Sequence, residues 1–305
     1  MAKHTIVNTA QGFHWLDVVN PTEAELLSLA EKYGIHKTSI QDCLDSKHLP
    51  KYEQIGSIHF AILRAYDEAS PHDADTVQEL TRKVALFYNE TFLITIHRKE
   101  QPYLSKVTEK WAHTDVSETI LVVAIVQDLI SAVLLTYDLP IEESLNQLES
   151  LEVNVFEAKD SKPFEIEEGY YLKRKASVFK RMLKASIDLL PKMTQTFQIQ
   201  SPDFQNLKED AEHYFFFAEE LMENTNSLLN LHLSHASQKT NEVMRLLTIF
   251  SMFLLPLNLI TGIYGMNFEH MPELKWAHGY PFALVTMLFI ASATFIWFKK
   301  KGWMK

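Results

Sequence analysis

The hydrophobic and polar positions of the first hundred or so residues alternate in a way that predicts strands mixed with helices. Short β-rich runs occur at HTIVN, GFHWLDVV, YEQIGSIHFAILRAYDE, TRKVALFYN and TFLITIHR, and a hairpin turn is predicted at Asn89 and Glu90. The segment NPTEAELLSLAEKYG has the marks of a helix, with Asn20 as its expected N-cap, Glu23 completing a capping box and Gly34 as its stop. These patterns predict an α/β domain with a mixed sheet flanked by helices.

From Ser117 onward the apolar spacing changes to that of helices. ETILVVAIVQDLISAVLLTYDL resembles a membrane span, but its apolar run is interrupted by Gln127 and Asp128 and is shorter than the ~20 residues that a bilayer requires. We therefore expect a buried helix that covers the sheet. Helical patterns continue, including a basic amphipathic helix that we expect to be a solvated surface. Residues 1–200 form one predicted α/β and helical domain.

A single long helix is predicted after this domain. From Pro202 the chain has neither proline nor glycine until Pro256, and the first helix stop is Gly262. This predicts a helix of about 60 residues, about 90 Å long at 1.5 Å per residue. Its polar part, residues 203–245, is interpreted as a stalk that leads into a membrane.

Two charge-free segments, residues 246–264 and 281–298, are each about as long as a bilayer is thick, and we predict that both are transmembrane helices. Lysine and arginine residues lie just before the first and in the tail 299–305, whereas the loop 265–280 contains only Lys275. The positive-inside rule then places both termini in the cytoplasm and the loop outside. We expect a multi-pass protein of the cell (inner) membrane.

Composition narrows the classes of function. The formal net charge of −10 argues against a nucleic-acid partner. Cys43 is the single cysteine, so the sequence contains neither an intrachain disulfide nor a cysteine-based zinc site. No nucleophile triad, phosphate-binding glycine loop or nucleotide motif occurs, so we expect neither an enzyme nor an organic cofactor. The N-terminal segment lacks the apolar core of a signal peptide, and we expect the bulk of the chain to remain in the cytoplasm.

One face of the first span collects most of its polar or small residues. Steps of three and four give the face Asn241, Met244, Thr248, Ser251, Leu255, Asn258 and Gly262. An amide in hydrocarbon needs partners or water, so Asn258 indicates either a water-lined pore or packing between helices. Two helices cannot enclose a pore, so a conducting path requires several copies of the chain.

The loop after the first span has chemistry suited to divalent cations. Glu269 and Glu273 would concentrate cations by their electric field. A ring of Asn267 carbonyl groups can accept hydrogen bonds from the waters of Mg²⁺, which gives up its hydration shell reluctantly. Gly265 allows a sharp turn at the end of the helix and close packing between subunits.

The segment YGMNF directly after the first span, followed by EHMPE and a second span that ends in KKK, resembles the CorA-type magnesium and divalent cation transporters. The resemblance is dense over residues 235–301, through QKTNEVMRLLTIF and PLNLITGIYGMN, whereas over residues 1–200 it is one of organisation, supported by HLPKYE. It implies a funnel-shaped homopentamer whose stalk helices line a pore. On this resemblance the pore entrance is formed by Gly265, Met266 and Asn267. The residues that would face the pore are Asn241, Met244, Leu255 and Asn258.

The resemblance also implies that intracellular Mg²⁺ binds between the cytoplasmic domains and holds the pore shut. The candidate ligands are acids of an exposed loop and of the stalk: Asp73, Asp75, Glu209, Asp210 and Glu212. Each acid, taken alone, is also typical of a solvated surface. Near the inner end of the pore, where an acid is expected, the chain has Asn230.

We therefore predict a homopentameric channel in the lipid bilayer that admits Mg²⁺ under the membrane potential, with Mg²⁺ as both transported and regulatory ion. Two alternatives stay open. A Zn²⁺ or Co²⁺/Ni²⁺ transporter shares the entrance motif, and His213, His232 and His235 could then supply nitrogen ligands. A membrane-anchored divalent-cation sensor or scaffold would use the spans only as a tether.

Overall fold

The structure is a computed structural model that describes residues 2–8, 12–112, 118–156, 166–197 and 202–303. The chain divides into two compact units, Met1–Leu229 and Asn230–Lys305. The boundary between the units falls inside one long helix, α8 (Pro202–Tyr264).

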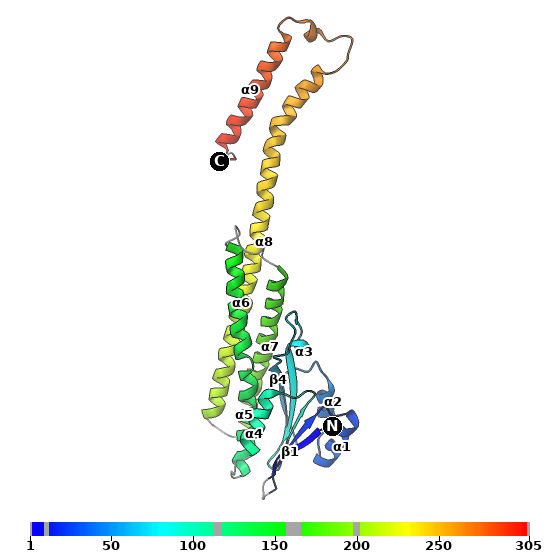
Figure 1. Cartoon of the computed structure of the whole chain (residues 1–305), viewed down its shortest axis with the longest axis vertical. Helices are drawn as coiled ribbons and strands as arrows, with labels where there is room; N and C mark the ends of the chain where they lie inside the picture. The colour runs from blue at the N-terminus through cyan, green and yellow to red at the C-terminus, as the bar shows by residue number, and fades with distance from the viewer. Residues whose placement is uncertain (1, 9–11, 113–117, 157–165, 198–201, 304–305) are drawn as a thin grey trace. The chain divides into compact units, whose positions relative to one another are not determined.

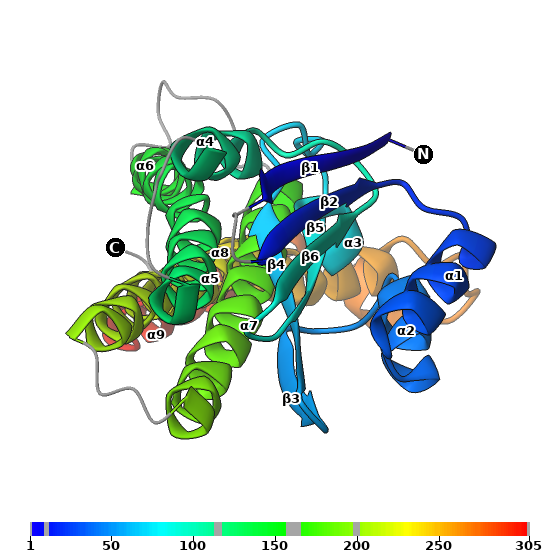
Figure 2. The same cartoon turned by 90° about the horizontal axis from the view of Figure 1, so that it is seen from below.

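The first unit contains, among its described residues, a six-stranded sheet (Figures 1 and 2). The strands lie in the order β1 (Ala2–Asn8), β2 (His14–Val19), β6 (Phe92–His97), β5 (Thr81–Tyr88), β4 (Ile58–Tyr66) and β3 (Lys51–Ile55). β2 and β6 pair in parallel and the other neighbours are antiparallel, so the predicted mixed sheet is confirmed. The predicted hairpin joins β5 to β6, where the side-chain oxygen of Asn89 accepts hydrogen bonds from the backbone N–H groups of Thr91 and Phe92.

Helices cover both faces of this sheet (Figure 2). Successive side chains of β4 point to opposite faces, because the side chains of a strand alternate. Phe60 and Ile62 pack with α1 (Glu23–Tyr33) and α2 (Lys37–Leu44), whereas Ala61 and Leu63 belong to the larger core on the other face. That larger core involves α4 (Pro102–Ala112), α5 (Glu118–Leu135), α6 (Asp138–Phe156), α7 (Ile166–Phe197) and the first part of α8. A short helix, α3 (Val77–Leu80), precedes β5.

The apolar helix α5 is buried inside the first unit, as predicted. Three stretches of the described chain are long and apolar enough to cross a membrane, and Leu121–Val155, which holds most of α5 and α6, is one of them. More than half of its most apolar window, 56%, is buried in the protein. Val126 and Ile130 of this helix belong to the core on the sheet. Protein side chains therefore cover this apolar surface.

The predicted start of α1 is wrong by two residues. Thr22 is the N-cap, with an extended backbone, and Glu25 rather than Glu23 completes the capping box: the Glu25 carboxylate accepts a hydrogen bond from the Thr22 N–H at 2.8 Å. Asn20 cannot cap the helix because its φ is +47°, in the left-handed region, whereas an N-cap residue has an extended backbone. Gly34 ends the helix with φ +71°, as predicted.

The second unit contains the end of α8, a 3₁₀ helix η1 (Pro272–Lys275) and α9 (Gly279–Lys300) (Figure 1). α8 has 63 residues and is about 95 Å long at 1.5 Å per residue, which confirms the predicted long helix. The most apolar windows of α8 and α9 are 0% and 6% buried in the single chain. These two helices therefore present apolar surface that the chain itself leaves uncovered.

Candidate functional site

One face of the last part of α8 carries small and polar residues together with Met244 and Leu255. We call this set the polar stripe: Asn241, Met244, Thr248, Ser251, Leu255, Asn258 and Gly262. All seven lie in α8, and at about 100° per residue they fall within roughly 100° of arc, so the helix brings them to one face. Met244 is 55% exposed and Leu255 is 66% exposed, which leaves this face open to other molecules.

The hydroxyl of Thr248 donates a hydrogen bond to the carbonyl of Met244 at 2.8 Å. A hydroxyl oxygen that donates inside its own helix still has lone pairs for an outside donor. The polar stripe therefore presents hydrogen-bond acceptors without leaving the hydroxyl hydrogen of Thr248 unsatisfied.

α8 ends in a close turn at Gly265. The N–H of Gly265 donates to the Thr261 carbonyl at 2.9 Å, and the N–H of Met266 donates to the Ile263 carbonyl at 3.2 Å. A Cβ atom on Gly265 would lie only 3.1 Å from the Thr261 carbonyl oxygen, whereas one on Gly262 would meet nothing within 4 Å. Close approach of backbone therefore favours glycine at position 265.

The side chains after this turn point into open space. Asn267 and Glu269 are exposed, as are Met266 (48%) and Phe268 (65%). The amide oxygen of Asn267 and the carboxylate of Glu269 are hydrogen-bond acceptors, so both can bind the water shell of a cation. Glu273 lies in η1, but its side chain is outside the described residues.

The second half of the loop packs on the start of α9, a contact that the sequence pattern did not predict. A cavity of about 520 Å³ lies here, and its lining includes Thr261, Tyr264, Gly265, Leu274, Trp276 and Tyr280. The ring of Trp276 lies 5.9 Å from that of Phe282 and 6.0 Å from that of His278. An aromatic residue within a polar loop was the available signal for this packing.

Three of the five candidate regulatory acids already have partners within the first unit. Asp75 forms an ion pair with Arg174 at 3.4 Å, Glu212 forms one with Lys208 at 3.5 Å, and Glu209 accepts a hydrogen bond from Gln205 at 2.8 Å. The other two, Asp73 and Asp210, are exposed, and neither forms an ion pair with any residue that the structure describes.

Neither the acids nor the histidines gather into a metal site within one chain. Over the described parts of the chain, no group of three or more His, Cys, Asp or Glu side chains is arranged to hold a metal ion. The ring of His213 instead packs against Phe217, with ring centres 4.8 Å apart. Asn230 is exposed.

Comparisons with known proteins agree with this organisation. The model of the family described as "CorA-like Mg2+ transporter protein" matches residues 10–300. The "Cobalt/magnesium transport protein CorA" of Thermotoga maritima is 27% identical over 299 residues, which cover 96% of this chain and 82% of that protein.

Two solved structures have the same fold. The CorA magnesium transporter of Methanocaldococcus jannaschii superposes with a TM-score of 0.71 at 22% identity, over 96% of this chain and 92% of that one. The full-length CmaX protein superposes with a TM-score of 0.72 at 17% identity, over 94% of this chain and 88% of that one.

Proposed function

The chain belongs to the family of CorA-like Mg²⁺ transporters, and we propose that it forms a homopentameric channel through which Mg²⁺ enters the cell. The observation that carries this proposal is the exposed turn Gly265-Met266-Asn267, which follows the charge-free last part of α8, residues 246–264, with its polar stripe. The Thermotoga maritima relative is named for cobalt and magnesium transport, which supports divalent cations as the substrate class.

At the entrance, Asn267 binds a hydrated ion rather than a bare one. Mg²⁺ holds its waters tightly, and a neutral amide oxygen accepts hydrogen bonds from those waters without adding a charge that would trap the ion. Glu269 and Glu273 raise the local cation concentration through their field. Gly265 allows the turn that places Asn267 directly beyond the end of α8.

The polar stripe lines the pore in this proposal. The most apolar stretches of α8 and α9 are uncovered in one chain, so they need lipid and neighbouring subunits as partners. Several copies of the polar stripe around a symmetry axis enclose a path with Asn258 and Asn241 amides along it. Met244 and Leu255 form narrow apolar rings that exclude water when the channel is closed.

The membrane potential drives the ion inward. A potential of 100 mV, inside negative, is worth about 2.3 kcal/mol per charge and therefore about 4.6 kcal/mol for a divalent ion. Lysine and arginine residues lie before the first span and after the second, whereas the loop contains only Lys275. The positive-inside rule therefore assigns both flanks to the cytoplasm and the loop to the outside. Nucleotide hydrolysis is then unnecessary.

Intracellular Mg²⁺ closes the channel by binding between first units of neighbouring subunits. One chain does not assemble a metal site from the residues described, so acids of two subunits would have to meet. Asp73 and Asp210 are the best candidates, because they are exposed and have no ion-pair partner among the described residues. Without Mg²⁺ these acids repel one another, and the subunits separate enough to wet the Met244–Leu255 constriction.

The test is cation flux into proteoliposomes that contain the purified protein. Mg²⁺, Co²⁺, Ni²⁺ and Zn²⁺ are compared with and without an inside-negative potential. We expect Mg²⁺ uptake that increases with the potential and needs no ATP. In Asn267→Ala, Mg²⁺ uptake should fall at least about tenfold, since one lost hydrogen-bonding group per subunit is worth ~1 kcal/mol or more.

The matched control is Asn224→Ala, which removes an exposed amide from the part of α8 that lies in the first unit. The control should retain both pentamer and flux. Full flux in an intact Asn267→Ala pentamer would contradict the entrance assignment. Zn²⁺ uptake with little Mg²⁺ uptake would favour the zinc alternative, and an intact oligomer that passes no ion would favour the sensor or scaffold.

A further inference from the structure

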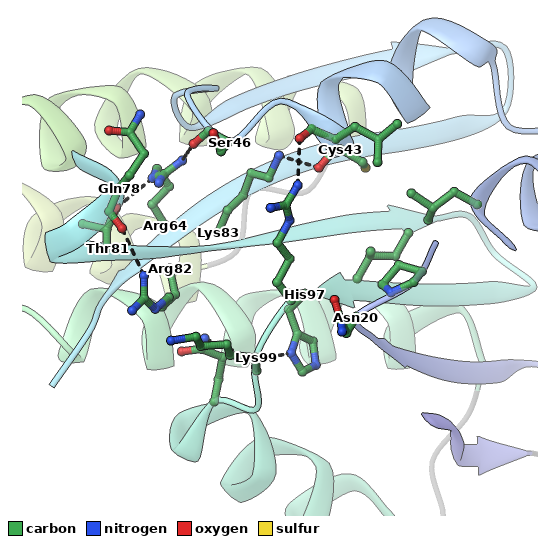
Figure 3. Close-up of a pocket in the computed structure, with 16 residues that line it drawn as sticks. Asn20, Cys43, Ser46, Arg64, Gln78, Thr81, Arg82, Lys83, His97 and Lys99 are labelled. Atoms are coloured by element: carbon green, nitrogen blue, oxygen red, sulfur yellow. Dashed lines mark hydrogen bonds between the residues drawn. The ribbon is translucent and has the colours of Figure 1, made fainter. Parts of the chain in front are cut away.

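The first unit contains a cavity of about 550 Å³ beside the sheet that is lined by positive side chains (Figure 3). We call it the basic pocket. Its cationic lining residues come from β4, β5 and the segment after β6: Arg64, Arg82, Lys83, Arg98 and Lys99. No aspartate or glutamate among the described residues lines it. A cavity with five cations is unexpected in a chain whose formal net charge is −10.

Three of these cations are held in place by the end of α2 and the segment after it. The ammonium of Lys83 donates to the carbonyls of Asp42, Cys43 and Asp45 at 2.8, 2.6 and 2.6 Å. The guanidinium of Arg64 reaches the carbonyl of Ser46 at 3.0 Å, on the same side (Figure 3). Arg98 donates to the carbonyl of Leu44 at 3.2 Å. The cations are therefore fixed by the fold rather than loosely gathered at a surface.

Those backbone partners do not neutralise the charge. A helix C-terminus carries only a partial negative charge, about half an elementary charge, against three full positive charges. Among the described residues, Arg64, Lys83, Arg98 and Lys99 form no ion pair with a carboxylate, and Arg82 alone is paired, with Asp67. Capping of α2 by itself thus leaves a positive field in the pocket.

Two further observations characterise the pocket. Burial lowers the pKa of Lys83 to about 8, and the charges of Arg64 and Arg98 add to this effect, whereas Cys43 and Asp45 oppose it. The buried Nε–H of Arg82 has no hydrogen-bond partner among the described residues. A buried donor without a partner costs about 1–3 kcal/mol, and an anion in the pocket would remove that cost.

We propose that the basic pocket binds a small phosphate-bearing molecule. Arginine and lysine are the side chains that recognise phosphate oxygens, arginine through its planar fork and lysine as a point charge. Arg98 and Lys99 are the exposed members of the set, so they can reach an anion that arrives from solvent. Arg82, His97 and Lys99 lie on the opposite side of the pocket from Cys43 and Ser46 in the close-up view (Figure 3).

The rest of the lining suits a ligand larger than inorganic phosphate. The volume falls within the usual range of about 300–1,000 Å³ for small-molecule sites. Leu26, Leu44 and Ile96 supply apolar surface, and the amides of Gln78 and Gln101 supply both donors and acceptors. The backbone of Asn20 at the pocket is in the left-handed region, a conformation that costs energy and is often found at binding sites.

This proposal is independent of the transport function, so it can fail or succeed alone. The test measures binding to the full-length protein in detergent by isothermal titration calorimetry, with Mg²⁺ removed by EDTA and ionic strength held constant. Inorganic phosphate, pyrophosphate, AMP and ATP are compared with chloride. We expect saturable binding of at least one phosphate compound. The compound that binds most tightly shows whether the phosphates alone or an attached nucleoside provide the affinity.

The double variant Arg98→Gln/Lys99→Gln should bind that compound at least about tenfold more weakly, because each charge-assisted hydrogen bond to a phosphate is worth roughly 1.5–3 kcal/mol. Both side chains are exposed, so the variant should keep the fold, which circular dichroism and the unfolding temperature verify. The matched control is Lys106→Gln, an exposed lysine of α4 outside the pocket. The proposal is overturned if no phosphate compound binds beyond chloride, or if the double variant and the control bind equally.

Discussion

At the residue scale, His97 shows how a buried side chain can be held in its charged form. Its Nε2 lies 3.1 and 3.2 Å from the carboxylate oxygens of Asp17, and its Nδ1 lies 2.5 Å from the carbonyl oxygen of Lys99. Both ring nitrogens thus face acceptors, so both must carry a hydrogen, as in the imidazolium form. Thr95 also donates to the Asp17 carboxylate, which fixes that partner in place.

The pH dependence of stability follows from this geometry. Burial lowers the pKa of His97, but the hydrogen bond and charge of Asp17, the Lys99 carbonyl and the charge of Glu100 outweigh it and raise the pKa above its ordinary value. A raised pKa stabilises the fold fully below about pH 6.5, the unfolded value, and this contribution is lost as the pH rises through the folded value. The unfolding temperature of the full-length protein should therefore exceed that of His97→Gln by more at pH 6 than at pH 9.

The control for this prediction is His59→Gln. Burial lowers the pKa of His59, so its charged form is disfavoured in the fold. The difference between wild type and this variant should change with pH in the opposite direction. A difference for His97→Gln that stays constant from pH 6 to pH 9 would show that folding leaves the pKa of His97 unshifted, which contradicts the prediction.

At the element scale, the single helix α8 has two kinds of surface. In the first unit it buries one face, formed by Phe204, Leu207, Ala211, Ala218, Leu221, Thr225 and Leu228. These residues recur every three, four or seven positions and pack against the domain, as in other amphipathic helices. In the second unit the described residues of α8 are not buried by the chain itself, and the polar stripe replaces the apolar face.

The proposed role of the polar stripe predicts the effect of replacing Asn258, whose amide is the group most costly to place in hydrocarbon. In Asn258→Leu, Mg²⁺ flux in proteoliposomes should fall at least about tenfold, because removing one hydrogen-bonding amide from each subunit is worth ~1 kcal/mol or more to the passing hydrated ion. Leu257→Ala, on the opposite face of the helix, should retain most of the flux. If Asn258→Leu instead abolishes the oligomer, as judged by native mass spectrometry, the amide serves packing between helices.

At the scale of the whole molecule, regulation in this proposal depends on acids that one chain leaves apart. The candidate acids are on the loop before α3 and on α8, and the ion pairs of Asp75 and Glu212 are with basic residues of the same chain. A regulatory Mg²⁺ between subunits therefore requires repeated copies of the first unit, in the same way that a pore requires repeated copies of the second.

Charge reversal tests this arrangement. In Asp73→Lys or Asp210→Lys, the Mg²⁺ concentration that half-inhibits flux should rise by about two- to fivefold, the effect of one exposed ion pair. Glu223→Lys, an exposed acid of α8 outside the candidate set, should leave that concentration unchanged. Unchanged sensitivity in charge reversals of all five candidate acids would remove them as ligands.

The sequence by itself determined most of the elements of this protein, because their signals are local. The spacing of apolar residues predicted the mixed α/β domain, the interrupted apolar run predicted the buried α5, and the absence of proline and glycine after Pro202 predicted the long α8. The structure confirms all three. Local signals were wrong where two nearby residues compete: Asn20 and Thr22 are both good N-caps, and only the backbone geometry at Asn20 excludes it.

Only the tertiary structure decided which distant residues share a site. Arg64, Lys83 and Arg98 belong to separate segments, and the strand register of the sheet brings them to the end of α2. The pairing of Asp17 with His97 likewise needs the parallel alignment of β2 and β6, which are far apart in the chain. Periodicity reports which face a residue occupies and a turn can set the register of one hairpin, whereas the pairing of strands far apart in the chain arises from long-range packing.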